Sequence, residues 1–427
     1  MGRAGDRADS EVEATGLERR ELLKALGIAG ATTLLPLGGA AFAQAAHAAA
    51  DATAAPTPST ESRRAFSELL ELLRKVEREY LSPARGVRSA EDVVDGDRFL
   101  LQLLWGALDQ YASRDAERPT FTRIVTPARK FLGDNPDAIY FSAPVRGDRA
   151  YRIRGNTAGA VYTSFTVEGG NADGSYPKRV VSALSDEKME IAPDGSYEIT
   201  VSAESRPGNW LRLEPDAGSL TTRHYFENET SAAADPSIFI PLWIDPLVDP
   251  GPPPRPDDAW VAERAHWVAN FVRGATLDQP LPDPKKLPAF VSLVPNTLGK
   301  PTKWKPEFGG FGAVDNAYSM GPFLLEPDQA LVIEGRMPRC RFANVMLWNR
   351  YLQTFEYPWR TISRNRRQMQ LGEDGAYRIA IAHRKPGTYD WLDTSGRRSG
   401  TVYWRFLLPE EDPPTPTTRV VPVAELG

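Results

Sequence analysis

Residues 194–199 (DGSYEI) recur 180 positions later as residues 374–379 (DGAYRI), and this repeat decides the predicted fold. Several other positions agree at the same spacing: Asp148 with Asp328, Ala150 with Ala330, Ile153 with Ile333, Gly155 with Gly335, Met189 with Met369, and Phe226 with Phe406. The agreement falls on turn glycines and on alternating strand positions, which is typical of an internal structural repeat. The sequence therefore predicts a duplicated β unit.

Both copies show the period of two that is expected of a strand with one solvated face. Apolar and polar residues alternate over residues 197–202 and again from residue 377. An Asp-Gly pair precedes each of these strands and predicts a tight turn. Each copy closes with an aromatic strand, residues 222–226 and 402–406. The predicted fold class is mainly β with N-terminal helices (α+β), with two tandem antiparallel β-sandwich-like units related by internal duplication.

Helical patterns precede the first β unit. Apolar residues follow a period of 3.6 from Phe66 to Tyr80, and a second helix is predicted from Ser89, with Leu101, Leu104, Leu108 and Tyr111 on its core face. The predicted organisation is a cleaved signal peptide (1–45), a flexible leader (46–61), a helical region (62–133), the first β unit (134–230), a proline-rich linker with a bracing helix and a loop (231–313), and the second β unit (314–427).

The N-terminus predicts export. Arg19 and Arg20 precede a short apolar run, residues 25–37, and small residues follow at 41–45. This pattern resembles a twin-arginine signal, with cleavage between Ala43 and Ala45. We therefore expect an exported bacterial protein, located in the periplasm, in the cell wall or outside the cell. Its expected partner is the twin-arginine export machinery, and no stable membrane span is expected after processing.

Composition excludes several function classes. The 427-residue chain has a formal net charge of −5 and no basic block in the mature part, which argues against nucleic acid as a partner. The single cysteine, Cys340, excludes an intrachain disulfide framework and a cysteine metal cluster. The histidines are isolated, so no metal site and no cofactor are predicted. Calcium stays open, because backbone and carboxylate oxygens bind it in many β folds without a sequence motif.

The first copy resembles the bacterial family called domain of unknown function 1214. The resemblance rests on four segments that occur in order: residues 151–155 (YRIRG), 194–196 (DGS), 207–211 (PGNWL) and 223–226 (RHYF). It covers roughly residues 134–230 and implies an envelope-associated, β-rich protein, with no settled reaction to carry over. The second copy departs from it at residues 386–392 (PGTYDWL) and 402–405 (VYWR), so equal function of the two copies is in doubt.

Candidate ligand-binding residues come from comparing the copies. Where the first copy has residues 168–170 (EGG), the second has residues 348–350 (WNR) followed by further aromatic residues. Aromatic faces stack on sugar rings, while amide and guanidinium groups bond hydroxyls or carboxylates. The candidates are Asn209, Trp210, Arg223, Trp348, Asn349, Arg350, Tyr351 and Trp359.

The sequence favours a cell-envelope protein that binds a glycan or similar hydroxylated small molecule at a cleft between the β units. Processing of the bound molecule is an extension of the same hypothesis. One alternative is a hydrolase or lyase with carboxylate or histidine acid–base chemistry. Its catalytic candidates are Asp194, His224 and Asp315, with Glu307 and Arg223 as further possibilities. The other alternative is a structural or interaction protein without a ligand.

Overall fold

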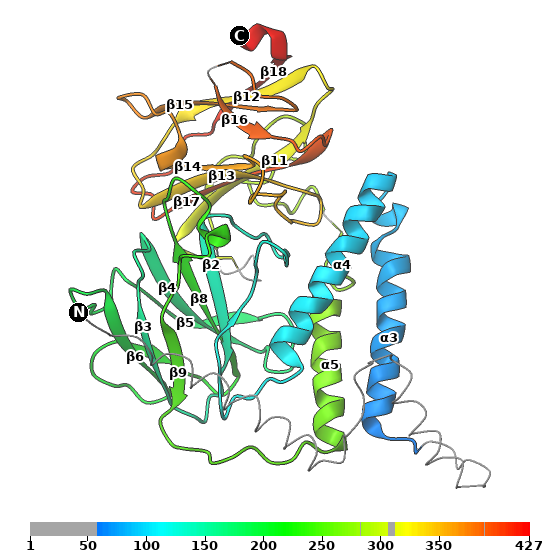
Figure 1. Cartoon of the computed structure of the whole chain (residues 1–427), viewed down its shortest axis with the longest axis vertical. Helices are drawn as coiled ribbons and strands as arrows, with labels where there is room; N and C mark the ends of the chain where they lie inside the picture. Colours follow the sequence, from blue (N-terminus) through cyan, green and yellow to red (C-terminus); the bar gives the residue numbers. More distant parts are fainter. Residues whose placement is uncertain (1–57, 282, 306–311, 388) are drawn as a thin grey trace, which may run out of the picture. The chain divides into compact units, whose positions relative to one another are not determined.

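The computed structural model describes residues 58–281, 283–305, 312–387 and 389–427 (Figure 1). The predicted signal peptide and most of the leader lie outside these residues, as do Glu307 and the glycines of residues 309–310. The prediction of export therefore stays a prediction.

The described residues form two β units with the same strand order, which confirms the predicted duplication (Figure 1). In the first unit, one sheet has the order β1-β2-β8-β4-β5 and the other β7-β6-β3-β9. Adding nine to each strand number gives the two sheets of the second unit, β10-β11-β17-β13-β14 and β16-β15-β12-β18. Even the parallel pair β6–β7 has its counterpart in β15–β16.

The strands of the first unit are β1 (Thr122–Arg123), β2 (Ala138–Pro144), β3 (Tyr151–Asn156), β4 (Tyr162–Gly169), β5 (Arg179–Ser185), β6 (Ser196–Ser202), β7 (Trp210–Arg212), β8 (Ala217–Tyr225) and β9 (Leu242–Pro246). Those of the second are β10 (Thr302–Lys303), β11 (Asn316–Leu324), β12 (Gln329–Arg336), β13 (Phe342–Trp348), β14 (Ser363–Asn365), β15 (Ala376–Ala382), β16 (Asp390–Asp393), β17 (Ser399–Leu407) and β18 (Thr417–Pro422). Because β9 pairs with β3, the first unit draws on the segment that was expected to be linker.

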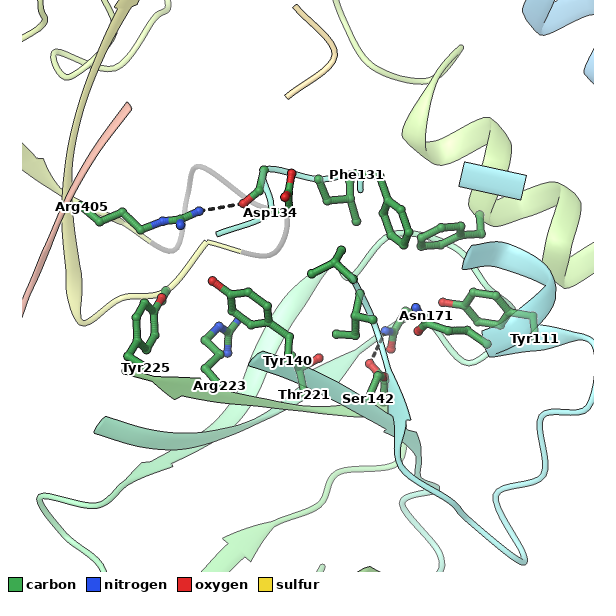
Figure 2. A pocket seen from close by; sticks show the side chains of 18 of the residues that line it. Tyr111, Phe131, Asp134, Tyr140, Ser142, Asn171, Thr221, Arg223, Tyr225 and Arg405 are labelled. Carbon is green, nitrogen blue, oxygen red and sulfur yellow. Dashed lines mark hydrogen bonds between the residues drawn. The ribbon is translucent and has the colours of Figure 1, made fainter. Parts of the chain in front are cut away.

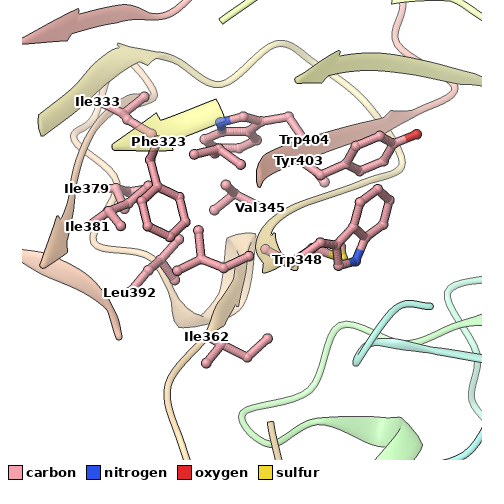
Figure 3. Close-up of a cluster of buried hydrophobic side chains, with 14 of the residues drawn as sticks. Phe323, Ile333, Val345, Trp348, Ile362, Ile379, Ile381, Leu392, Tyr403 and Trp404 are labelled. Atoms are coloured by element: carbon pink, nitrogen blue, oxygen red, sulfur yellow. The ribbon is translucent and has the colours of Figure 1, made fainter. Parts of the chain in front are cut away.

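Each unit is a β-sandwich, because its apolar core draws on both of its sheets. In the first unit, Ile153 and Ile199 of one sheet share a core with Phe165 of the other. In the second, Ile333 and Ile379 pack with Val345, Phe323 and Trp404 (Figure 3). Burial of such side chains is the main stabilising contribution, at about 1.5–3 kcal/mol for each.

The 180-residue spacing holds in some strand pairs and fails in others. Gly155 faces Tyr197, and Gly335 faces Tyr377 in the same way. Ser164 pairs with Arg223, however, whereas Met346 pairs with Tyr403. Since 223 and 403 differ by 180 but 164 and 346 by 182, β13 is displaced by two residues. Trp348 is therefore the structural counterpart of Thr166, and not of Glu168 as the sequence comparison assumed.

Three long helices lie beside the sandwiches (Figure 1): α3 (Glu61–Tyr80), α4 (Ala90–Tyr111) and α5 (Asp258–Ala275). The predicted start of α4 is confirmed, since Ser89 and Asp92 form a capping box. Its predicted core face is wrong at Leu101, which is 72% exposed, and at Leu108, which is 44% exposed, but right at Tyr111, which is 4% exposed, and at Leu104, which packs against the same cluster. The buried face of α4 carries small and polar residues as well as Phe99, Leu103 and Tyr111. Within the described residues, no helix is both long and apolar enough to cross a membrane.

Candidate functional site

Strand β8 is buried on both faces, because one face packs in the sandwich and the other lies beneath the helices and loops. Leu220 belongs to the sandwich core. Ser219, Thr221, Arg223 and Tyr225 alternate with the residues of that face and line a cavity. A buried strand face made of hydroxyl, phenol and guanidinium groups needs polar partners, so it marks a place where the protein can bind a polar molecule.

The cavity has a volume of about 100 Å³, well above the roughly 10–15 Å³ that one water molecule requires. Figure 2 shows Arg405 at one end and Tyr111 of α4 at the other, with Arg223 and Tyr140 between them. Near Tyr111 the cavity is lined by apolar side chains of one buried cluster, Ile124, Val125, Phe131, Leu132 and Phe271, and by the polar Asn171, which lies beside Tyr111 (Figure 2). The cavity can therefore receive an amphipathic molecule.

Both β units contribute to the other end of the cavity. The first closing strand supplies Arg223 and Tyr225, and the second supplies Arg405. At the 180-residue spacing, Arg223 corresponds to Tyr403 and Tyr225 to Arg405, so the two strands carry Arg and Tyr in exchanged positions. Tyr403 packs beside the cavity, with its ring centroid 5.1 Å from the guanidinium carbon of Arg405.

The loop between Phe131 and Asp134 forms one wall of the cavity. Leu132 has a φ of 56°, which is uncommon for a residue other than glycine, and Gly133 has a φ of 75°. A Cβ atom at Gly133 would lie 2.9 Å from the Trp348 ring. Trp348 Nε1 in turn donates a hydrogen bond of 3.0 Å to the Asp134 carbonyl oxygen. These contacts fix the loop so that the Gly133 carbonyl accepts a hydrogen bond from Arg405.

Asp134 itself is buried and held by the second unit. Its carboxylate accepts hydrogen bonds from the backbone N–H of Thr354, at 2.8 Å, and from the Thr354 hydroxyl. Burial raises the pKa of Asp134 above its usual range, against the effect of Lys130.

A second buried carboxylate, Glu168, lies beside β8 on the neighbouring strand β4. Glu168 accepts hydrogen bonds from Ser219, at 2.8 Å, and from Thr221, at 3.1 Å, and both hydroxyls line the cavity. Asn171, also a lining residue, donates to the Ser219 hydroxyl at 2.6 Å. The other carboxylate oxygen of Glu168 has no hydrogen-bond partner among the described residues. Burial raises the pKa of Glu168 to about 7, so this group can exchange a proton near neutral pH.

The structure places the predicted ligand-binding residues in three different settings. Arg223 lines the cavity and donates a hydrogen bond of 2.9 Å to Thr166. Trp348 is 2% exposed, supports the cavity loop and stacks on Tyr403 at 4.0 Å. Trp359, by contrast, is 86% exposed. The structure thus brings Arg223 and Trp348 to the cavity and its wall, and leaves Trp359 at the surface.

The neighbours of Trp348 in the chain make structural contacts. Asn349 is buried and bonds Gln353 within its own loop. Arg350 donates hydrogen bonds to the carbonyls of Gly86 and Arg85. Tyr351 donates to the Asp92 carbonyl at 2.8 Å and stacks on Phe99. Arg350 and Tyr351 thus attach the second unit to the helical region, whereas Asn349 holds the loop from which they project.

Asn209 and Trp210 lie away from the cavity, at the β6–β7 edge. The Asn209 side chain bonds the backbone of Glu190 and Glu198, which fixes the adjoining loop. It also lines an open groove on the outer face of the first unit, near Trp243. Trp210 donates to the Ser202 carbonyl at 3.2 Å.

The three catalytic candidates do not meet. Asp194 is at an exposed turn, where hydrogen bonds from Ser196 lower its pKa. His224 points away from the cavity, with its ring 6.4 Å from that of Phe165, and burial lowers its pKa to about 3. Asp315 accepts a hydrogen bond from the Tyr162 hydroxyl at the junction of the units. No two of them share the cavity.

In the described part of the chain, we find neither a metal site nor a reactive cysteine. There, no group of three or more His, Cys, Asp or Glu side chains is arranged to hold a metal ion. Burial raises the pKa of Cys340 to about 11, so its thiol is protonated at neutral pH.

Sequence reasoning missed most of the cavity, because its lining comes from separate parts of the chain. Tyr111 lies on α4, Phe271 on α5 and Phe131 in the loop before β2. One sequence signal could have found it: polar residues at 219, 221, 223 and 225 alternate along a strand that ends in aromatic residues. A period-two row of such residues is the usual mark of a solvated face, whereas here the face is covered.

Comparisons with known proteins agree with the duplicated fold. The model of a family described as a protein of unknown function (DUF1214) matches residues 141–228 and 331–411, one segment in each β unit. Among curated proteins, none matches the chain.

Two solved structures are similar to the chain. An uncharacterised protein from Burkholderia cenocepacia has 28% sequence identity and a TM-score of 0.73, over 86% of this chain and 98% of its own. A protein from Vibrio parahaemolyticus has 15% identity and a TM-score of 0.46, over 77% of this chain and 98% of its own. The Burkholderia cenocepacia structure supports the arrangement of helices and sandwiches described above.

Proposed function

We propose that this chain, a member of the DUF1214 family with two copies of the domain, binds a small hydroxylated molecule, such as a glycan fragment, in the cavity between its closing strands. The observation that supports the proposal most is the composition of the covered β8 face, where Ser219, Thr221, Arg223 and Tyr225 surround a space of about 100 Å³. Hydroxyl, amide and guanidinium groups can each bond a ligand hydroxyl.

The apolar half of the cavity supports the same ligand class. The rings of Tyr111, Phe131 and Phe271 contact one another, with centroid distances of 5.3 Å and 6.0 Å from Phe271. Such rings provide the apolar surface against which the C–H face of a sugar or an aromatic ring packs. Polar groups at one end and rings at the other would orient the ligand along the cavity.

A cavity-filling substitution tests the proposal. Ser142 is half-buried on β2 and lines the cavity, so we expect Ser142→Leu to occupy part of the space. A thermal-shift screen of small glycans, polyols and phenols should give hits with the wild type that weaken at least tenfold in the variant. Ser205→Leu, at an exposed loop position, is the matched control. Hits that are unaffected by Ser142→Leu would place the binding site elsewhere.

A second candidate function is an enzyme, a hydrolase or lyase, that uses Glu168. The favouring observation is the raised pKa of a buried carboxylate whose partners, Ser219 and Thr221, line the cavity. The hydroxyls could relay a proton between Glu168 and a bound molecule. Once a ligand class is found, turnover with wild type and Glu168→Gln would test this. Turnover that Glu168→Gln leaves unchanged would exclude Glu168 as the acid or base.

We also propose that the chain is exported by the twin-arginine route. Support comes from the sequence alone: Arg19 and Arg20 precede an apolar run and small residues. Fusion of residues 1–60 to a reporter that is active only after export should give signal, and replacing both arginines by lysine should abolish it. Retention of signal in that variant would contradict this route.

A further inference from the structure

The cavity contains a buried cation whose surroundings within the described residues are poor in acceptors. Arg405 is 7% exposed and projects from β17 into the cavity (Figure 2). Its Nη2 donates a hydrogen bond of 2.8 Å to the Gly133 carbonyl, and its Nη1 lies 3.9 Å from the Met346 sulfur, a weak acceptor. A guanidinium group has five N–H donors, so several of them face the cavity without a strong acceptor.

Arg405 makes no close ion pair in the part of the chain that the structure describes, although the buried carboxylates of Asp134 and Asp137 feel its charge and Asp137 is itself held by Asn344 and Asn365. No carboxylate there lies within 4.0 Å of its guanidinium nitrogens. Asp134, on the same wall, is directed to Thr354. Arg366 of the same unit shows the usual arrangement, with bonds of 2.7 Å and 2.8 Å to Glu227. Buried charges are ordinarily paired, because an unpaired one costs several kcal/mol.

Several of the groups around Arg405 are phenol hydroxyls, which can donate hydrogen bonds. Tyr140, Tyr225 and Tyr318 line the same end of the cavity, and the ring of Tyr403 lies over the guanidinium group. Burial raises the pKa of Tyr318 to about 12 and that of Tyr140 well above its usual value. These two phenols therefore stay protonated at neutral pH and can donate. A guanidinium group surrounded by phenol hydroxyls is suited to an oxyanion.

We propose that the molecule bound in the cavity is a hydroxylated carboxylic acid, with its carboxylate at Arg405 and the rest of the molecule toward Tyr111. The inference rests on the proposed function and specifies its ligand class. A carboxylate is planar and matches two parallel N–H donors of a guanidinium group. The apolar far end of the cavity, around Phe131 and Phe271, disfavours a ligand that is charged throughout.

Matched pairs of acid and alcohol test the assignment. The probes are D-gluconate against D-sorbitol, 4-hydroxybenzoate against 4-hydroxybenzyl alcohol, and inorganic phosphate, measured by thermal shift and calorimetry. We expect at least one acid to bind about ten- to hundredfold more tightly than its alcohol, and Arg405→Met to abolish this preference. Arg336→Met, at a surface position, is the control and should change neither binding constant.

Each outcome decides a different point. Alcohols that bind as tightly as acids would overturn the carboxylate assignment and leave the cavity proposal standing. Phosphate that binds more tightly than the acids would replace carboxylate by phosphate. A preference for acids that survives Arg405→Met would place the anion elsewhere. Hits of both kinds that are unaffected by Ser142→Leu would overturn the cavity proposal itself.

A second measurement needs no ligand. If the Arg405 charge awaits a ligand anion, replacing it by methionine removes an uncompensated buried cation, so Arg405→Met should unfold at the same or a higher urea concentration than the wild type. A clearly lower midpoint would show that Arg405 serves to hold the Gly133 loop, and would overturn the inference even if none of the probes binds.

Discussion

The closing strands of the two β units, β8 and β17, pair with equivalent neighbours but serve different purposes. In β8, the face beneath the helices is polar from Ser219 to Tyr225 and forms the long wall of the cavity. In β17, only Arg405 lines the cavity, while Trp404 and Phe406 lie in the sandwich core. The duplication thus produced two β units of the same topology. Because Arg and Tyr occupy exchanged positions in β8 and β17, the two strands place different side chains at the same cavity.

The difference extends to the strands beside them. Thr166 of β4 accepts a hydrogen bond from Arg223, whereas its counterpart Trp348 of β13 fills the space beside Gly133. The first unit thus keeps polar groups at the cavity, and the second supplies the support that fixes the cavity loop. Five substitutions, beside one control, test this division of roles.

The largest effect is expected for Trp348→Ala. The side chain is 2% exposed, stacks on Tyr403 and bonds the Asp134 carbonyl. Its loss should lower the free energy of unfolding by about 3–5 kcal/mol and weaken ligand binding, because the cavity loop loses its support. Urea denaturation measures the stability. Trp359→Ala, at a side chain that is 86% exposed, is the control and should change little. Equal effects of the two substitutions would contradict the supporting role of Trp348.

The next largest effect is the change in stability with pH that Glu168 causes. Burial raises its pKa to about 7, from 4.5, so the folded protein binds this proton more tightly than the unfolded chain. The contribution of Glu168 to stability is therefore greatest below pH 4.5 and falls as the pH rises to about 7. The loss amounts to at most about 3 kcal/mol.

Glu168→Gln should remove this dependence. The amide oxygen can still accept from Ser219 and Thr221, but it does not titrate. Urea midpoints measured from pH 4.5 to pH 8 should fall more for the wild type than for the variant. Parallel curves for the two proteins would show that Glu168 does not carry a raised pKa.

Equal losses of stability are expected at Gly155 and Gly335, where the two β units have the same packing. A Cβ atom would lie 2.4 Å from the Tyr197 hydroxyl oxygen at Gly155 and 2.5 Å from that of Tyr377 at Gly335. Gly155→Ala and Gly335→Ala should therefore each lower the free energy of unfolding by about 1–3 kcal/mol through overpacking. Urea denaturation of both variants measures this. A large effect at one site alone would show that the two cores tolerate strain differently.

The smallest effect is expected for Asn209→Ala. The side chain bonds backbone groups of Glu190 and Glu198 at a surface edge, so its loss should cost about 1 kcal/mol. Ligand affinity, measured by calorimetry with any cavity ligand, should not change, because Asn209 lies outside the cavity. A loss of affinity would direct attention to the groove near Trp243.

Some of this fold could be predicted because it depends on local patterns. The alternation from Tyr197 and the Asp-Gly turns determine strands wherever they occur, and their recurrence at 180 residues predicted two equivalent units. The capping box at Ser89 likewise fixed the start of α4. The buried face of α4 could not be predicted in the same way, because Leu101 and Tyr111 are equally apolar in sequence and only the neighbouring elements decide which of them is covered.

The candidate site could be predicted only in part. Arg223 lies in a segment that carries the family resemblance, and it was predicted to bind a ligand. Arg405 lies in a segment where the second copy departs from the family pattern, and it was not predicted as a site residue. The aromatic group from Trp348 to Trp359 suggested a binding surface, but Trp348 is covered and Trp359 is exposed. Ring and guanidinium chemistry is the same in a core, at an attachment point and in a binding site, so composition alone does not separate these roles.

By itself, the sequence determined the duplication, the strand period, the turns and the helix start at Ser89, since each follows from interactions between residues close together in the chain. Only the tertiary structure decided which faces are covered, how far β13 is displaced against its partner strand, and that Arg223 and Arg405 meet at one cavity. Those outcomes depend on packing between segments as far apart in the chain as Gly133 and Arg405, 272 residues, and on strand register, where a shift of two residues changes which side chains face each other.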